Sequence, residues 1–143
     1  MKSKVLYHGS GKRMIGNKLL PKKPRDLNNI KENEYRGIYA TNIKKLATIM
    51  GLTSGRGISG SCLMGYHKNP YGIIYNGWPK NKYFYVYTLH SDSFKNKPRG
   101  SGQWISSKSV KPIKIEKFEV KDYIHLVRKP TKKELKEWNK KLK

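Results

Sequence analysis

The pattern of apolar and polar residues predicts many short strands along this chain of 143 residues. Apolar runs bounded by Gly, Pro, Asn or Ser predict strands at residues 4–8, 37–40, 61–66, 72–75, 83–89 and 103–106. Residues 83–89, Tyr-Phe-Tyr-Val-Tyr-Thr-Leu, consist almost entirely of residue types that favour a sheet. An imperfect alternation over residues 112–120 predicts a strand with a bulge, and residues 123–127 predict one more strand.

A helix is predicted directly after the second strand. Its apolar residues follow the i, i+3, i+4, i+7 spacing of one helix face, at Ile43, Leu46, Ala47 and Met50. Thr41 or Asn42 is expected to cap its start, and Gly51 to end it. The glycine-rich residues 51–60 are then expected to form a flexible loop. Their glycine spacing resembles a dinucleotide-binding pattern, but it follows a helix rather than a strand, which excludes a Rossmann site.

A second helix is predicted at the C-terminus. Thr131 and Glu134 have the spacing of a capping box, and the apolar residues after it are Leu135, Trp138 and Leu142. Together the elements predict one α+β domain over residues 1–127. Residues 128–143 form a basic C-terminal helix that packs on or extends this domain. It carries eight basic residues and two acidic ones, and is either a solvated helix or an arm that holds a polyanion.

Charge adds a second constraint. The chain has 32 Lys and Arg against 9 Asp and Glu, a formal net charge of +23. This excess favours polyanionic partners and leaves too few carboxylates for a calcium-binding module. Lys outnumbers Arg by 26 to 6, although Arg is the better bidentate ligand of phosphate. Biased composition and solubility therefore remain an alternative explanation of the charge.

Metal and membrane sites are not expected. The single cysteine, Cys62, excludes an internal disulfide and a cysteine-based zinc site, and it is expected to be a packed thiol in a strand. The histidines are scattered, with no carboxylate at ligand spacing. Residues 1–7 lack the apolar run of a signal peptide, and no run approaches 18 apolar residues. We expect a cytoplasmic protein.

Strand-end residues are the best candidates for a site. His8 ends the first strand and precedes Gly9, so that a ring nitrogen suited to a ribose hydroxyl stands beside a backbone that a flat amide can approach. Tyr39 lies in the second strand, where its ring is able to stack on such an amide. Gln103 begins a later strand, after a loop that contains glycine. Each of the three side chains also has a purely structural explanation.

The order of these residues resembles the ADP-ribosyltransferases of the diphtheria-toxin and poly(ADP-ribose) polymerase type. Residues 6–10 (Leu-Tyr-His-Gly-Ser) resemble their first motif, and residues 36–41 (Arg-Gly-Ile-Tyr-Ala-Thr), with the helix that follows, resemble the second. The strand at 83–89, the next loop and Gln103-Trp104 stand where the third motif belongs. The compact layout is also similar to that of the small rifamycin-modifying transferases. The resemblance covers residues 4–120.

The resemblance implies a fold, a substrate and roles. The fold would have split antiparallel β-sheets with short helices, and the substrate would be NAD. His8 would hydrogen-bond the adenosine-side ribose, Gly9 the nicotinamide amide, Ser10 would support that end of the pocket, and Tyr39 would stack on the nicotinamide ring. The implied reaction is mono-ADP-ribosylation of an acceptor, for which the basic surface suggests nucleic acid.

One position departs from the family. Poly(ADP-ribose) polymerases have Glu at the third motif, and here Gln103 stands there, which supplies neither charge nor a general base. The rifamycin-modifying group has an Asp after the Phe of its loop, and residues 94–98 (Phe-Lys-Asn-Lys-Pro) contain no acid. Asp92 is the nearest acid in the sequence. A catalytically silent module that binds NAD, ADP-ribose or RNA is therefore a second hypothesis.

Two further hypotheses come from other classes. A small basic ribonuclease would use two histidines among His8, His90 and His125 as acid and base, although their spacing specifies no pair. A protein that coats nucleic acid would use interleaved Tyr and Lys side chains, for which residues 83–87 are able to provide a face.

Overall fold

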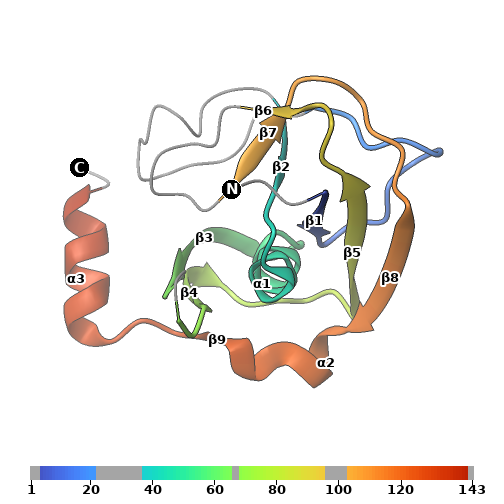
Figure 1. The fold of residues 1–143 in the computed structure, drawn as a ribbon. Helices are drawn as coiled ribbons and strands as arrows, with labels where there is room; N and C mark the ends of the chain where they lie inside the picture. The colour runs from blue at the N-terminus through green and yellow to red at the C-terminus, as the bar shows by residue number, and fades with distance from the viewer. Residues whose placement is uncertain (1–3, 22–36, 66–67, 96–102, 142–143) are drawn as a thin grey trace.

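The computed structural model describes residues 4–21, 37–65, 68–95 and 103–141. Within these residues the chain is α+β, as predicted, and its helices are short (Figure 1). In chain order the elements are β1 (Val5–Ser10), β2 (Ile38–Ala40), α1 (Lys44–Thr53), β3 (Ile58–Met64), β4 (Tyr71–Gly77), β5 (Tyr83–His90), β6 (Phe94–Lys95), β7 (Trp104–Ser106), β8 (Lys114–Glu119), α2 (Val120–Tyr123), a 3₁₀ turn (Ile124–Leu126), β9 (Val127–Arg128) and α3 (Lys132–Lys141).

The described strands form three small sheets, in the orders β1-β5-β8, β2-β7-β6 and β3-β4-β9. The first two are antiparallel, and in the third β4 and β9 run parallel. Tyr7 of β1 joins the first two sheets through a bridge to Thr41, just after β2. The strands β1 and β2, which are far apart in the sequence, therefore lie side by side in the structure.

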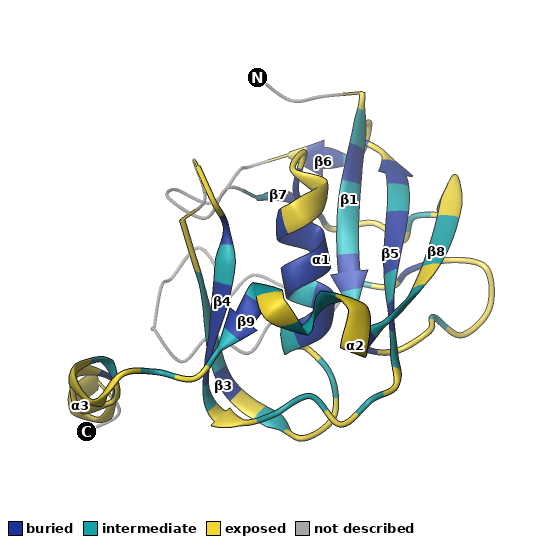
Figure 2. Ribbon diagram, turned by 90° about the horizontal axis from the view of Figure 1, so that it is seen from below, coloured by how far each residue is buried: buried dark blue, intermediate teal, exposed yellow. Residues whose placement is uncertain are grey.

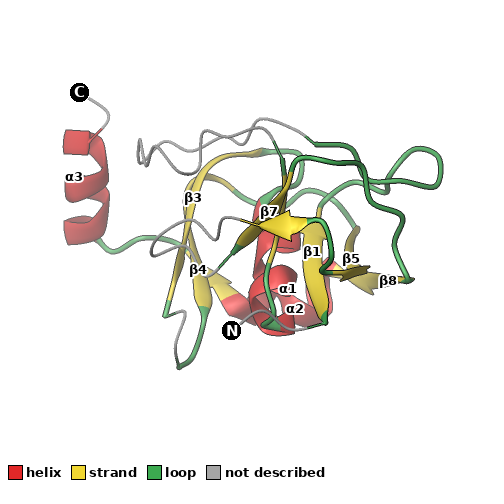
Figure 3. Ribbon diagram, turned by 45° about the horizontal axis from the view of Figure 1, so that its top comes forward, coloured by secondary structure: helices red, strands yellow, loops and turns green. Residues whose placement is uncertain are grey.

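Helix α1 lies between the β1-β5-β8 sheet and the β3-β4 hairpin (Figure 3). It continues to Thr53, so the prediction that Gly51 ends it was wrong. A Cβ at Gly51 would lie 2.6 Å from the ring of Phe84, which shows that this glycine admits an aromatic ring against the helix. The predicted side-chain cap was also wrong, because the cap residue is Ile43. Thr41 lies two residues before Ile43, and its Oγ1 accepts a hydrogen bond from the Ile43 amide at 3.1 Å.

The two faces of the β1-β5-β8 sheet bury separate apolar clusters. One cluster packs toward the β2-β7-β6 sheet, with Leu6, Leu19, Ile38, Ala40, Tyr87, Leu89, Phe94 and Trp104 as its buried members. The other packs around α1, with Ala47, Ile49, Leu52, Ile74, Phe84, Val86, Val120 and Val127. Figure 2 shows the buried stretch of α1 close to β1. Side chains on alternate residues of β1 and β5 consequently enter different cores.

Two strand predictions in the second half of the chain were wrong in detail. Residues 112–120 contain no bulge, since β8 pairs with β5 in an unbroken register from Lys114 to Glu119. The irregular pairing occurs instead in β3, between Ile58 and Ser61. Most of the strand predicted at 123–127 is helical, and only Val127 belongs to a strand. The predicted loop at 51–60 is shorter than expected, because α1 and β3 each occupy part of it.

The C-terminal helix begins with the predicted capping box. The Glu134 amide donates to Thr131 Oγ1 at 3.2 Å, and the Thr131 amide donates to Glu134 Oε1 at 2.8 Å. Trp138 is buried by stacking on Tyr75 of β4, at 4.3 Å between ring centres and 6° between ring planes. Leu135 remains 40% exposed, and Leu142 lies outside the described residues. The helix stands beside the β3-β4-β9 sheet, away from the rest of the chain (Figure 1).

Candidate functional site

The strands β1, β2 and β7 meet at a junction that contains three of the five predicted site residues, His8, Gly9 and Gln103. His8 pairs with Tyr87 in the register of β1 and β5, so it lies on the same face of the sheet as the Tyr87 ring, 6.1 Å away between ring centres. Its Nδ1–H donates to the carbonyl oxygen of Tyr39 in β2 at 2.7 Å. A carbonyl only accepts, so Nδ1 carries the proton, and in the neutral ring Nε2 is an acceptor. The hydrogen bond thus fixes both the orientation and the tautomer of the His8 ring.

The backbone of Gly9 points toward the edge where β2 ends. The Tyr7 amide donates to the Thr41 carbonyl at 2.7 Å, and the Thr41 amide donates to the Tyr7 carbonyl at 2.9 Å. Because backbone groups alternate in direction along a strand, the N–H and C=O of Gly9 face the same side as those of Tyr7, one step beyond the bridge. They therefore point away from β5, toward the edge of the sheet beside β2.

Gly9 also explains how closely α1 approaches β1. A Cβ at this position would lie 1.8 Å from the Ala47 carbonyl oxygen and 2.6 Å from the Gly51 nitrogen. No side chain fits there, since such distances are far inside van der Waals contact. The glycine expected from the sequence to admit a ligand amide thus also admits a helix on the other face of the strand.

Gln103 lies next to this junction. Its neighbour Trp104 pairs with Ala40, so continuing the antiparallel register places Gln103 beside Thr41, the residue that bridges to Tyr7. Its side chain is half-buried. The structure therefore brings His8, Gly9 and Gln103 to one end of β2, although they come from distant parts of the chain.

The other two predicted residues flank the junction. Tyr39 supplies the carbonyl that orients His8, and its own side chain is 8% exposed. Ser10 Oγ accepts a hydrogen bond from the Lys12 amide at 3.1 Å, and Ser10 pairs with Tyr85 of β5. Ser10 therefore shapes the turn that follows β1.

Asp92 lies away from the junction. It is exposed in the turn between β5 and β6, and β6 begins at Phe94, which pairs with Ser106. Ser106 is the end of β7 opposite Gln103. Among the described residues, no carboxylate pairs in register with any strand residue of this junction. The position that the resemblance assigns to an acid is thus neutral.

The histidines proposed for a ribonuclease do not converge. His90 is exposed and pairs with Val5, three positions along β1 from His8, about 10 Å by strand geometry. His125 is exposed in the 3₁₀ turn after α2. His67 lies outside the described residues.

Cys62 is the packed thiol that the sequence predicts. It is half-buried in β3, and its Sγ donates to Tyr75 Oη at 3.7 Å. Burial raises the pKa of the Cys62 thiol and also that of the Tyr75 hydroxyl. A raised pKa keeps the thiol protonated at neutral pH, and only the thiolate is a nucleophile. Cys62 is therefore unsuited to nucleophilic catalysis.

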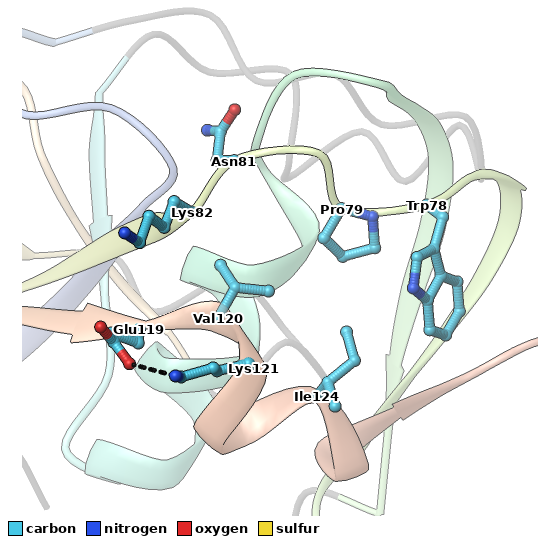
Figure 4. A pocket seen from close by; sticks show the side chains of 8 residues that line it. All are labelled: Trp78, Pro79, Asn81, Lys82, Glu119, Val120, Lys121 and Ile124. Atoms are coloured by element: carbon cyan, nitrogen blue, oxygen red, sulfur yellow. Dashed lines mark ion pairs between the residues drawn. The ribbon is translucent and has the colours of Figure 1, made fainter.

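The sequence analysis missed a recess of about 330 Å³ between the start of β5 and α2. Trp78 and Pro79 line one side, Lys82 and Glu119 the other, and Val120 and Ile124 form apolar lining between them (Figure 4). The dashed line in Figure 4 marks the Glu119–Lys121 ion pair, at 3.4 Å. A Trp-Pro step between two strands, close to several lysines, is the sequence signal for this recess.

The described residues contain no group of three His, Cys, Asp or Glu side chains able to hold a metal ion. No helix in the same residues is long and apolar enough to cross a membrane. Comparison of the chain with models of known families, with curated proteins and with solved structures finds no match.

Proposed function

We propose that this protein binds NAD as a substrate and transfers its ADP-ribose to an acceptor, on an ADP-ribosyltransferase-like arrangement of split antiparallel sheets. The observation that carries the proposal is the pairing of His8 with β2. The hydrogen bond from Nδ1 to the Tyr39 carbonyl, at 2.7 Å, fixes the orientation and tautomer of the ring beside the backbone of Gly9.

These groups match the parts of NAD in a simple way. Nε2 of His8 would accept a hydrogen bond from a ribose hydroxyl, and the N–H and C=O of Gly9 would pair with the carboxamide of nicotinamide. Tyr39 would stack on the nicotinamide ring, as the resemblance implies. A flat amide at a strand edge repeats the hydrogen bonds of a neighbouring strand, so no further side chain is needed there.

The reaction would break the bond between nicotinamide and ribose and form a bond from the same ribose carbon to an acceptor oxygen or nitrogen. Nicotinamide leaves with the bonding electron pair, the acceptor supplies a new pair, and its proton passes to solvent. The ribose becomes positive between these events, and negative charge stabilises such a transition state. Gln103 is able to hydrogen-bond a ribose hydroxyl but adds no charge, so we expect slow transfer of single ADP-ribose units.

Two measurements test the proposal. NAD binding by calorimetry should fall about tenfold in His8→Phe, which keeps a ring and removes both hydrogen bonds. His90→Phe is the matched control, because His90 is exposed at the other end of the same strand pair, and it should bind NAD normally. Incubation with labelled NAD and RNA, DNA or protein should label an acceptor. If the wild type binds no NAD, the proposal is wrong.

The neutral side chain of Gln103 favours a second candidate, a silent module that binds NAD or ADP-ribose without transfer. Gln103→Glu separates the two functions. If the wild type binds NAD without releasing nicotinamide, and the variant gains NAD hydrolysis, the silent module is correct. If the wild type already labels an acceptor, the transferase is correct, and the added charge should increase its rate.

A further inference from the structure

Three partly exposed aromatic side chains, two on β5 and one in the segment between β4 and β5, lie next to lysines. Lys129 Nζ lies 5.3 Å from the centre of the Trp78 ring. Lys117 Nζ lies 3.9 Å from the centre of the Tyr83 ring, and Lys82 Nζ lies 5.4 Å from the same centre. The third ring, Tyr85, pairs with Lys117 across the two strands. We call these three rings and three lysines the aromatic–lysine track.

The recess lies between Trp78 and the rest of the track. Trp78 lines one side of it and Lys82 and Glu119 the other (Figure 4). Lys82 lies over Tyr83, and Glu119 is the cross-strand partner of Tyr83. Tyr83 and Tyr85 are two positions apart in β5 and share one face of the sheet. Tyr83 and Tyr85 therefore follow one another along β5, and Trp78 stands across the recess, where it packs against the apolar cluster around α1.

The charge along the track is positive. Glu119 is neutralised by Lys121 at 3.4 Å. Glu116 belongs to the opposite face of β8, where it pairs with Val86 and lies 2.7 Å from Lys44 Nζ. Each lysine of the track lies over an aromatic ring. A partner that complements it must alternate flat apolar groups with negative charges.

We propose that the aromatic–lysine track binds single-stranded nucleic acid. Unpaired bases stack on aromatic side chains, and the phosphates between them contact lysines, without a requirement for sequence. A duplex buries its base faces and would meet only the lysines. The proposal deepens the proposed function and rests on it in one respect: a strand on the track would be the acceptor. Tyr85 shares a sheet face with Ser10 and His8, so the track leads toward the junction.

Binding is measured without NAD, by fluorescence anisotropy of a labelled oligouridylate of about 12 nucleotides and of a duplex of equal length. The single strand should bind more tightly than the duplex. The double variant K82Q/K117Q should weaken single-strand binding about tenfold and reduce the slope of log affinity against log salt by about 0.7 for each lysine removed. The control K45Q/K133Q removes two exposed lysines from α1 and α3 and should have a much smaller effect.

The aromatic contribution is tested separately. Tyr83→Leu should weaken single-strand binding about tenfold and leave the salt slope unchanged, because stacking releases no counterions. The oligouridylate should quench tryptophan fluorescence, and Trp78→Phe should remove most of this quenching, since Trp104 and Trp138 are buried. If a ring variant does not fold, the K82Q/K117Q variant, which changes two exposed lysines, still tests whether the track binds single strands.

Two results would overturn the proposal: equal affinity for duplex and single strand, or equal losses in K82Q/K117Q and K45Q/K133Q. Either result would mean that the surface attracts polyanions by charge alone. Failure of NAD binding together with normal strand binding would reject the proposed function and leave the track in place. NAD binding without selective binding of single strands would reject the aromatic–lysine track as a nucleic-acid site and leave the proposed function in place.

Discussion

His8 and Gly9 are adjacent in β1, yet they serve opposite faces of its sheet. His8 lies on the face of Tyr87 and Leu6, and the missing side chain of Gly9 makes room for α1 on the other face. The backbone N–H and C=O of Gly9 point in a third direction, toward the strand edge beside Thr41. A His-Gly pair at a strand end therefore places a polar side chain, a backbone edge open to hydrogen bonding and the contact with a packed helix within two residues.

This arrangement predicts that Gly9→Ala is strongly destabilising. The new methyl group would overlap the α1 backbone, at 1.8 Å from the Ala47 carbonyl oxygen. Because backbone cannot rotate away as a side chain does, we expect a loss of about 3 kcal/mol, at the upper end for overpacking. The measurement is the free energy of unfolding in urea. NAD binding should fall with it only to the extent that the fold is lost.

The control for this prediction is Gly16→Ala. Gly16 has a φ of +79° and no atom within 4 Å of the site of a Cβ. Alanine there costs only the strain of a positive φ, about 1 kcal/mol. If Gly9→Ala were no more destabilising than Gly16→Ala, α1 would not pack on β1 as closely as described.

At the scale of elements, local sequence signals predicted helices and strands correctly where residues close together in the sequence determine the structure. The capping box of Thr131 and Glu134 forms as its spacing predicts, and the aromatic run of β5 forms a strand. The prediction of helix and strand boundaries failed where contacts with distant segments of the chain determine the structure. Gly51 stays helical because Phe84 packs on it, and residues 123–127 are mostly helical, although their apolar pattern is ambiguous over so short a run. The local sequence pattern does not predict that His8 and Gln103 lie at one junction, since this depends on strand pairing.

Helix α3 is expected to loosen in acid. Two hydrogen bonds from Arg128, at 2.8 and 2.9 Å, and one from the Thr131 amide lower the pKa of Glu134 to about 2, from an ordinary 4.5. A lowered pKa in the folded state means that the contribution of this carboxylate is complete above pH 4.5 and is lost as the pH falls toward 2. The docking of α3 should weaken over that range.

Near-ultraviolet circular dichroism of the stacked Tyr75–Trp138 pair reports this docking. Glu134→Gln should show a weaker signal at neutral pH and no change between pH 4.5 and 2. Glu137→Gln, on the same helix and exposed, is the control and should titrate as the wild type does. An identical acid profile in Glu134→Gln and the wild type would reject the role of this carboxylate.

Over the whole molecule, the net charge of +23 opposes folding, because like charges are closer in the folded state than in the unfolded chain. Ion pairs offset little of this charge, since those found within the described residues involve only Glu116, Glu119 and Glu134. The melting temperature should therefore rise by about 5 °C as sodium chloride increases from about 0.1 to 1 M, which shortens the screening length from about 10 to 3 Å. Differential scanning calorimetry measures the change.

A comparison of anions separates screening from specific binding. Under pure screening, chloride and sulfate at equal ionic strength give similar shifts apart from a small added effect of sulfate on burial. If charge is concentrated at a ligand site, a short single-stranded oligonucleotide at micromolar concentration should raise the melting temperature further, because a ligand of the folded state stabilises it by mass action. K82Q/K117Q should keep the salt effect and lose much of the oligonucleotide effect. If it kept both, the charge would be spread evenly and the track would have no special role.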